Sequence, residues 1–247
     1  MRDSLRHFVA EFIGTFALVF VGGAAIMSSG ANNPAGLLHV ALAHGLILAL
    51  MISALMRISG HFNPAVTIGI LAARRIEPVM AALYIVAQLL GAMVAAYALK
   101  FTFPADLFAA TQGGGQSIAA EINGWQAFTL EMIATFFLVF VVFGTAVDPR
   151  GPKVGGFAIG LTVAADILAL GPHTGASMNP ARSFGPAVAT RIFVGQGIYW
   201  TAPIVGGILA ALIYDTLFLR SGPEPLDHGE LDPLASDAPA PRRPRRS

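Results

Sequence analysis

Two copies of the tripeptide Asn-Pro-Ala are the first candidates for chemistry in this sequence. Asparagine is a preferred N-cap residue, and proline fits the first helical position because the N–H that it lacks has no intrahelical partner there. Each copy therefore predicts a helix start, where the helix dipole places roughly half a positive charge. The asparagine carboxamides can cap the helices and still offer N–H donors to a small polar molecule. The candidate residues are Asn63, Pro64, Ala65, Asn179, Pro180 and Ala181.

Three ionisable residues accompany these tripeptides. Arg182 directly follows the second copy, and Glu11 and Glu131 lie within apolar stretches. A buried carboxylate is costly unless it is hydrogen-bonded. We therefore expect Glu11 and Glu131 to be structural, accepting N–H bonds from the segments that carry the tripeptides; a proton relay is the alternative. The function of a fourth such residue, Asp166, is not predicted.

Composition decides which elements must position these residues. Hydrophobic residues make up 55 % of the 247 residues, charged residues make up 12 %, and the mean hydropathy is +0.68. Soluble domains carry about 25 % charged residues, so a membrane-embedded chain is expected and nucleic-acid binding is not. A membrane span needs about 20 apolar residues. Six such runs occur, at about 8–28, 36–58, 79–99, 127–147, 154–171 and 197–219.

Two shorter apolar stretches, at 64–73 and 180–190, begin with the Asn-Pro pairs and predict half-membrane helices. The fold class expected is an all-α membrane protein of six transmembrane helices and two half-helices. The distribution of basic residues supports this layout. With a cytoplasmic N-terminus, 12 of the 15 basic residues fall on the cytoplasmic side, a strong positive-inside bias. Residues 221–247 are rich in Pro and charge, and we expect them to form a disordered cytoplasmic tail.

The sequence also repeats itself. Glu-x-x-x-Thr-Phe begins at Glu11 and again at Glu131, 120 residues later, and Asn63 recurs as Asn179, 116 residues later. Each copy contains three predicted spans. Since three is odd, the second copy enters the membrane upside down, and a site is expected near the midplane between the copies. We therefore expect one channel domain, 1–220, with repeats at about 8–100 and 127–219.

These motifs resemble those of the aquaporin (major intrinsic protein) family. The resemblance spans residues 8–219 and rests on Ile-Ser-Gly-His-Phe-Asn-Pro-Ala-Val-Thr at 58–67 and Thr-Gly-Ala-Ser-Met-Asn-Pro-Ala-Arg-Ser at 174–183. It implies a homotetramer of independently conducting pores, passive flow and no cofactor. It also implies a selectivity filter of four residues. The positions that match this filter are His44, Ile167, Ala176 and Arg182.

This set of filter residues is most similar to that of the tonoplast-type intrinsic proteins. His44 is matched across a one-residue deletion between Ser59 and His61, and an interior histidine away from the lumen is its alternative. Ile167 and Ala176 predict a ring that is wider and less polar than that of strict water channels. Ser183 stands where glycerol channels have aspartate.

The function expected is a passive transmembrane channel for water, and also for small neutral solutes such as ammonia, urea or glycerol, that excludes protons and ions. A glycerol facilitator and a proton-coupled secondary transporter remain alternatives. An enzyme is not expected, because no nucleophile–base pair or metal-ligand cluster is recognisable, and the absence of cysteine excludes a thiolate metal site. We expect contact with membrane lipid and location in the bacterial inner membrane, with both termini cytoplasmic.

Overall fold

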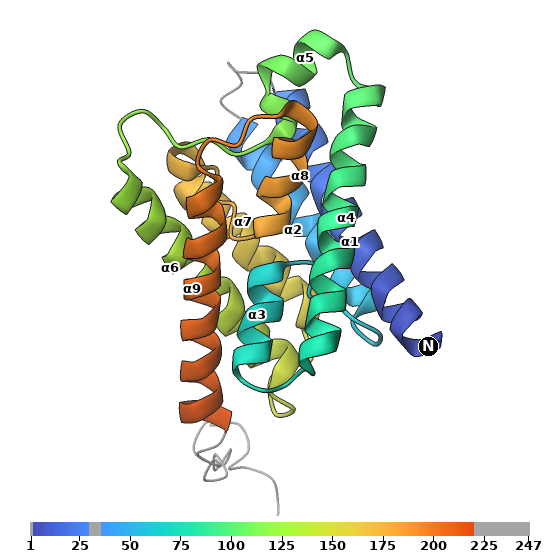
Figure 1. Ribbon diagram of the computed structural model, residues 1–247. Coiled ribbons are helices and arrows are strands. Elements are labelled where there is room, and N and C mark those ends of the chain that lie inside the picture. The colour runs from blue at the N-terminus through green and yellow to red at the C-terminus, as the bar shows by residue number, and fades with distance from the viewer. Residues whose placement is uncertain (1, 30–35, 220–247) are drawn as a thin grey trace, which may run out of the picture.

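The computed structural model describes residues 2–29 and 36–219, and within these ranges it contains six long apolar helices (Figure 1). Each is long and apolar enough to cross a membrane, which confirms the six spans predicted from hydropathy. π-Helical turns extend α6 to Val147 and α9 to Leu219. The six helices are α1 (Arg2–Ser29), α2 (Gly36–Leu55), α4 (Pro78–Thr102), α6 (Gly124–Val142), α7 (Gly155–Thr174) and α9 (Gln196–Tyr214).

Two shorter helices follow the Asn-Pro pairs: α3 (Pro64–Ala72) and α8 (Pro180–Thr190). Their positions agree with the predicted half-membrane helices. In Figure 1, α3 occupies the lower half of the bundle and α8 the upper half. The connection between α4 and α6 contains a short helix, α5 (Ala105–Ala110), and a 3-10 turn, neither of which was predicted.

The helices pack in two matching sets. Helix α1 packs on α4 as α6 packs on α9, and α3 lies against α9 as α8 lies against α4, while α2 and α7 meet between the sets. Glycines permit the matching approaches: a Cβ on Gly91 would collide with the Phe12 carbonyl, and a Cβ on Gly206 with the Met132 carbonyl. Small residues at such crossings allow helix backbones to come close in lipid.

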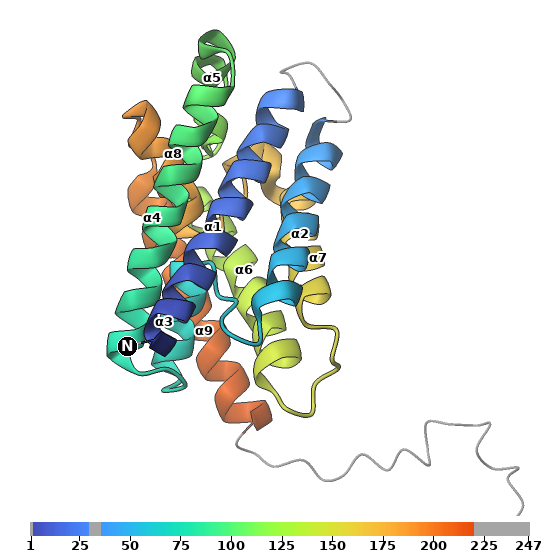
Figure 2. The ribbon, with the colours of Figure 1, turned by 90° about the vertical axis from the view of Figure 1, so that its right-hand side faces the viewer.

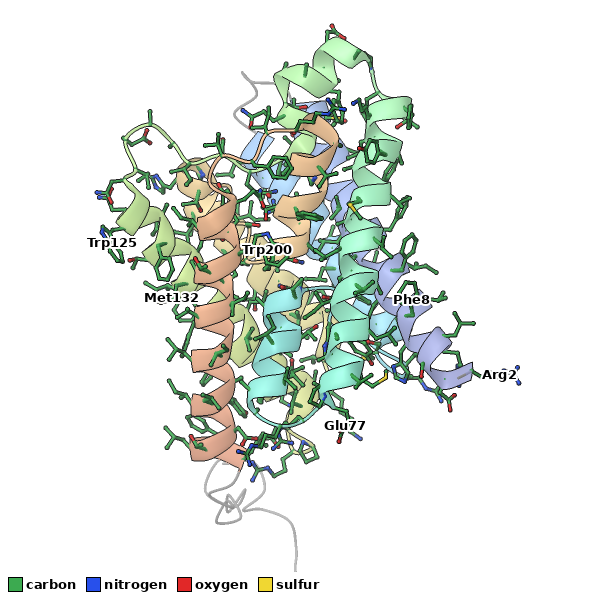
Figure 3. The ribbon with its side chains drawn as sticks, viewed as in Figure 1. Arg2, Phe8, Glu77, Trp125, Met132 and Trp200 are labelled. Atoms are coloured by element: carbon green, nitrogen blue, oxygen red, sulfur yellow. The ribbon has the colours of Figure 1, made fainter. Side chains whose placement is uncertain are left out.

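Both described ends of the chain lie at one end of the bundle, which we call the basic end (Figures 1 and 2). Arg2 and Glu77 lie towards this end in Figure 3, whereas Trp125 projects from α6 near the opposite end. Tryptophan is typical of the membrane–water interface. The loops of the basic end carry Arg57, Arg74, Arg75, Arg150 and Lys153.

Two arginines of the basic end tie its loops to the last turn of α9. The Arg75 guanidinium lies 2.6 Å from Asp215, and Arg150 donates to the Phe218 carbonyl at 2.7 Å. Arg150 also binds Asp148 through two bonds of 2.9 Å. These hydrogen bonds lower the pKa of Asp148 to about 2. Arg150 thus joins the loop before α7 to the last described turn of the chain through hydrogen bonds.

Candidate functional site

The two asparagines cap their half-helices in the same way. Asn63 Oδ1 accepts the Ala65 N–H at 2.8 Å, and Asn179 Oδ1 accepts the Ala181 N–H at 3.0 Å. Both asparagines have extended backbone, with φ of −158° and −149°. Proline occupies the first helical position in each case, as the residue preferences predict.

Each asparagine also donates a hydrogen bond to the opposite loop. Asn63 Nδ2 donates to the Met178 carbonyl at 2.8 Å, and Asn179 Nδ2 donates to the Phe62 carbonyl at 2.9 Å. A carboxamide nitrogen carries two hydrogens. One hydrogen of each asparagine therefore joins the two half-helices, and the other remains for a molecule between them.

The residue before each asparagine adopts the left-handed conformation. Phe62 has φ of 48° and Met178 has φ of 54°. This region is unfavourable for residues with a side chain and persists only where the surroundings enforce it. The strain recurs at equivalent positions of the two repeats, and in each repeat a buried glutamate binds the strained segment.

Glu11 in α1 holds the first loop. It accepts the backbone N–H of His61 at 2.9 Å and that of Phe62 at 2.7 Å, together with the Ser59 hydroxyl. The Gln88 amide of α4 adds a fourth bond at 2.6 Å. The carboxylate is completely buried, so these donors offset a large cost of desolvation.

Glu131 in α6 holds the second loop with the same geometry. It accepts the N–H groups of Ser177 and Met178, both at 2.8 Å, and the Thr174 hydroxyl at 2.7 Å. It is also completely buried. Each glutamate thus binds two consecutive backbone amides of a loop and one hydroxyl that precedes them.

A small central cavity lies where the two loops meet, with a volume of about 20 Å³. A single water needs roughly 10–15 Å³ of such space, so the cavity has room for one or two water molecules. Apolar side chains from α1, α2, α6 and α7 form most of the wall, and the polar atoms come from the loops. The polar or ionisable side chains in this wall are His61, Asn63, Ser177, Asn179 and Arg182.

A wider cavity of about 510 Å³, the vestibule, lies towards the end opposite the basic end. Arg182 is the one described residue that lines both the vestibule and the central cavity. Its Nη1 donates to the Ala176 carbonyl at 2.8 Å and to the Gly175 carbonyl at 3.3 Å. The guanidinium is therefore fixed at the junction, and its Nε has no hydrogen-bond partner among the described residues.

The structure places the four predicted filter residues unequally. Ile167 and Arg182 line the vestibule, whereas His44 and Ala176 line neither cavity. His44 is buried against Gly22 of α1 and binds the Val40 carbonyl through Nδ1 at 2.8 Å, although its ring is close enough to Arg182 for their charges to interact. Ala176 contributes its backbone carbonyl, which accepts the hydrogen bond from Arg182. The filter roles of His44 and Ala176 therefore remain predictions.

The structure does not place the remaining residues of the two tripeptides in the wall of the central cavity, and the pore-lining role of these residues stays a prediction. Pro64, Ala65, Pro180 and Ala181 are buried and do not appear in the wall of the central cavity. Ala65 approaches Gly207 of α9, and Ala181 packs on α1 and α4. The reason is geometric: only the N-cap residue lies ahead of the helix, while the first helical residues face the surrounding bundle.

Some residues of the site were not predicted from the sequence. Gln88 links Glu11 to Thr67, whose hydroxyl it contacts at 2.9 Å. Phe62 is completely buried and lines the central cavity, and its ring fills the space that a side chain on Gly14 would need. The role of Gln88 could have been suspected, because a glutamine inside the apolar run at 79–99 is unusual. No sequence pattern pointed to the position of Phe62.

Asp166, beside Ile167 on α7, is nearly buried. Its Oδ2 atom has no hydrogen-bond partner in the part of the chain that the structure describes. The structure thus leaves its function unassigned.

Comparison with known proteins identifies the family. The family model described as "Major intrinsic protein" matches residues 1–214. Probable aquaporin TIP3-2 of Arabidopsis thaliana is 42 % identical over 253 residues, covering 95 % of this chain and 92 % of the relative. Aquaporin TIP2-3 of Zea mays is 46 % identical over 228 residues, covering 88 % of this chain and 90 % of the relative.

A solved structure gives the same result. The aquaglyceroporin from Plasmodium falciparum matches with a TM-score of 0.75 and 26 % identity, covering 88 % of this chain and 98 % of that one. The relatives named above from curated sequences are plant proteins, which does not fit the expected bacterial inner membrane. The supported location is that of an integral, multi-pass membrane protein. The chain belongs to the major intrinsic protein family.

Proposed function

We propose that this protein is a passive channel for water that also admits small neutral solutes. The proposal rests above all on Arg182, which lines both the vestibule and a central cavity that has room for one or two water molecules and is also lined by Asn63 and Asn179. Relatives in the family are aquaporins, and the family consists of passive channels rather than enzymes.

Among the described residues, the walls of the vestibule and the central cavity contain fixed hydrogen-bond donors and no aspartate or glutamate. A water leaving the vestibule meets the Arg182 guanidinium, whose N–H groups bind the oxygen of the water. It then meets the free N–H groups of Asn63 and Asn179, which bind the oxygen again. Its hydrogens therefore point away from the midpoint, and a continuous chain of water molecules that could conduct protons is interrupted.

Cations are opposed at the same two places. Arg182 carries a full positive charge at the junction, and the N-termini of α3 and α8 each contribute roughly half a charge at the centre. Glu11 and Glu131 do not offset this barrier in the lumen, because their carboxylates bind loop donors.

The wall of the vestibule supports passage of small neutral solutes. Beside Arg182, α7 presents Ile167, Gly171 and Pro172 to the vestibule, and none of these three residues carries a charge. Ammonia and urea are the solutes that we propose. The similarity to an aquaglyceroporin favours glycerol as the second candidate.

Stopped-flow light scattering on proteoliposomes distinguishes these solutes. We expect fast water flow, weaker urea and ammonia flow, and the slowest glycerol flow, each measured relative to protein-free vesicles. Glycerol flow that exceeds water flow on this scale would assign the protein to the glycerol facilitators.

The proton-coupled transporter is tested separately. It would require a carboxylate that gains and loses a proton during transport, whereas Glu11 and Glu131 each hold at least three donors. Proteoliposomes with an imposed pH gradient should show no uptake of urea above its external concentration. Concentrative uptake that depends on the gradient would overturn the channel proposal.

We further propose that residues 1–220 form one channel domain of two inverted repeats, and that the basic end is cytoplasmic. The predicted tail, 221–247, lies outside the described residues. Homotetramer formation is proposed from family membership and from an exposed leucine stripe on α2, which is available for lipid or a second copy. This stripe comprises Leu38, Leu42, Leu46 and Leu50. Light scattering of the purified protein in detergent, corrected for bound detergent, should give the mass of four chains; the mass of one chain would refute the tetramer.

A further inference from the structure

A second polar pocket lies beside the vestibule and apart from the central cavity. It has a volume of about 290 Å³ and is enclosed by the connection between α5 and α6, by α8, and by the connection between α8 and α9. We call it the side pocket. No aspartate, glutamate, lysine or arginine of the described residues lines it. The polar side chains in its wall are all uncharged: Gln112, Gln116, Ser117, Ser183, Thr190 and Gln196.

Gln116 differs from the other glutamine that closes the side pocket because its carboxamide has no partner. Its Oε1 and Nε2 are both buried, and neither makes a hydrogen bond to any residue that the structure describes. A carboxamide carries two donor hydrogens and an acceptor oxygen, and burying them unpaired is costly. Gln196, in contrast, accepts the Ser183 hydroxyl and donates to the Ser183 carbonyl, both at 3.2 Å. Gln116 therefore has its full hydrogen-bonding capacity available.

Two further groups of the side pocket retain part of their capacity. The Thr190 hydroxyl gives its hydrogen to the Pro186 carbonyl at 2.8 Å and accepts the Ile192 N–H at 3.3 Å, which leaves one lone pair. Nε2 of Gln196 carries a second hydrogen that its bond to Ser183 does not use. Donors and acceptors thus face the pocket from α8, from α9 and from the connection before α6.

We propose that the side pocket binds a small uncharged polyol, with Gln116 as its main hydrogen-bonding group. Each hydroxyl of a polyol both donates and accepts, which matches a carboxamide and a wall of mixed donors and acceptors. An ion would find no opposite charge to offset the loss of its hydration, and an apolar ligand would leave Gln116 unpaired. The volume is far larger than a single water needs, so it accommodates a chain of several carbons that carry hydroxyls.

The position of the side pocket places such a ligand next to the channel entrance. Gly115, Gln116 and Ser117 line both the side pocket and the vestibule, so this short segment separates the two. Gln116 also packs against Gly175, where an added Cβ would lie 2.8 Å from the Gln116 Cβ. The Gly175 carbonyl in turn accepts a bond from Arg182. A polyol bound by Gln116 therefore lies beside the vestibule without entering it.

NMR of the glutamine side chains tests the proposal on the full chain in detergent, independently of transport and so of the proposed channel function. Labelling with nitrogen-15 glutamine gives a pair of side-chain signals for each of Gln88, Gln112, Gln116, Gln126 and Gln196. Erythritol should shift the signals of Gln116 and Gln196 saturably, with half-saturation on the order of 10 mM, the weak binding expected for so small a ligand. Gln88, which binds Glu11, and Gln126, which caps α6, should not shift.

The same titration contains the results that would overturn the proposal. An unchanged Gln116 signal would mean that erythritol does not bind there, and equal shifts of all the glutamines would mean a general solvent effect. A shift at Gln116 without one at Gln196 would place erythritol in the vestibule, which Gln196 does not line. The diol 1,4-butanediol has the same carbon chain and two fewer hydroxyls, and it should bind about tenfold more weakly. Equal affinity for the diol would mean that the pocket does not recognise hydroxyls.

Two variants locate the site. Gln116→Leu removes the carboxamide but keeps a side chain of similar size, and the shift at Gln196 should then need about tenfold more erythritol. Thr190→Val keeps nearly the same shape at a residue that lines neither the vestibule nor the central cavity, and it should weaken binding about threefold. Glu121→Ala, at an exposed position before α6, is the control and should not change binding. Unchanged affinity in Gln116→Leu or in Thr190→Val would contradict the proposed site.

Discussion

The loop before α3 and the loop before α8 share one support but present different groups to the lumen. In both, a buried glutamate binds two consecutive amides, the second of these amides belongs to a left-handed residue, and the asparagine that follows caps the half-helix. Only the second loop is followed by an arginine at the junction of the two cavities, and only the first carries a histidine in the central wall. The support is duplicated because it positions backbone, whereas the side chains that face the lumen are free to differ.

Removing either glutamate should have the largest effect on stability and water flow. The two removals should have similar effects, because each glutamate supports one loop in the same way. Glu131→Ala leaves three buried donors without an acceptor, each costing about 1–3 kcal/mol, so we expect a lower thermal unfolding temperature and loss of water flow. Glu11→Ala should behave similarly because it holds at least as many donors. Glu121→Ala, at an exposed loop position, serves as the control. An unfolding temperature that drops for one glutamate alone would break the equivalence of the loops.

Substitution of Arg182 should change solute flow more than substitution of a residue in the first loop, and so should show how the two loops differ. Arg182→Val removes the charge and the fixed donors at the junction, and we expect urea and glycerol flow to rise about tenfold, the change that 1.4 kcal/mol off a barrier produces. A comparison change beside the first tripeptide, His61→Val, should raise solute flow far less. Uptake of labelled solute into proteoliposomes measures both. Equal effects of the two substitutions would show that the junction does not control size.

The asparagines should give smaller and nearly equal effects. Asn63→Ala and Asn179→Ala each remove an N-cap, at a cost of about 0.5–2 kcal/mol, and one bond to the opposite loop. Because those bonds join the same two loops, the double variant should lose less stability than the sum of the single variants. Denaturant titration in detergent measures this coupling, and strict additivity would argue that the two caps act independently.

The smallest effect is expected outside the site, at the loop before α7. The pKa of Asp148 is about 2 because Arg150 donates hydrogen bonds to it, so its pairing stabilises the fold above the ordinary aspartate range and is lost only as pH falls through about 2. Asp148→Asn should therefore lower the unfolding temperature slightly and equally at about pH 5 and about pH 8. A clearly smaller effect at about pH 5 than at about pH 8 would mean that Asp148 is partly protonated at pH 5, and so that its pKa is raised rather than lowered.

Much of the fold was predictable because local rules govern it. Apolar runs gave the six spans, and the Asn-Pro pairs gave the starts of α3 and α8, since capping depends on adjacent residues. The glutamates could be assigned to loops because an unpaired buried carboxylate is too costly to keep.

The rest depended on contacts between distant segments. The bond from Asn63 to the Met178 carbonyl joins residues 115 positions apart, and no pattern in either segment specifies it. His44 fits the family filter by position, yet its neighbour Gly22 leaves room for the ring to lie between helices. The contact of His7 with Tyr84 likewise follows only from the packing of α1 on α4.

The central claim is that water passes this pair of loops while protons do not. Stopped-flow light scattering on proteoliposomes that contain a pH-sensitive dye measures both flows in one sample. We predict water permeability well above that of protein-free vesicles and a proton leak equal to theirs. A proton leak that rises with the amount of protein, or water flow no faster than through lipid, would contradict this account.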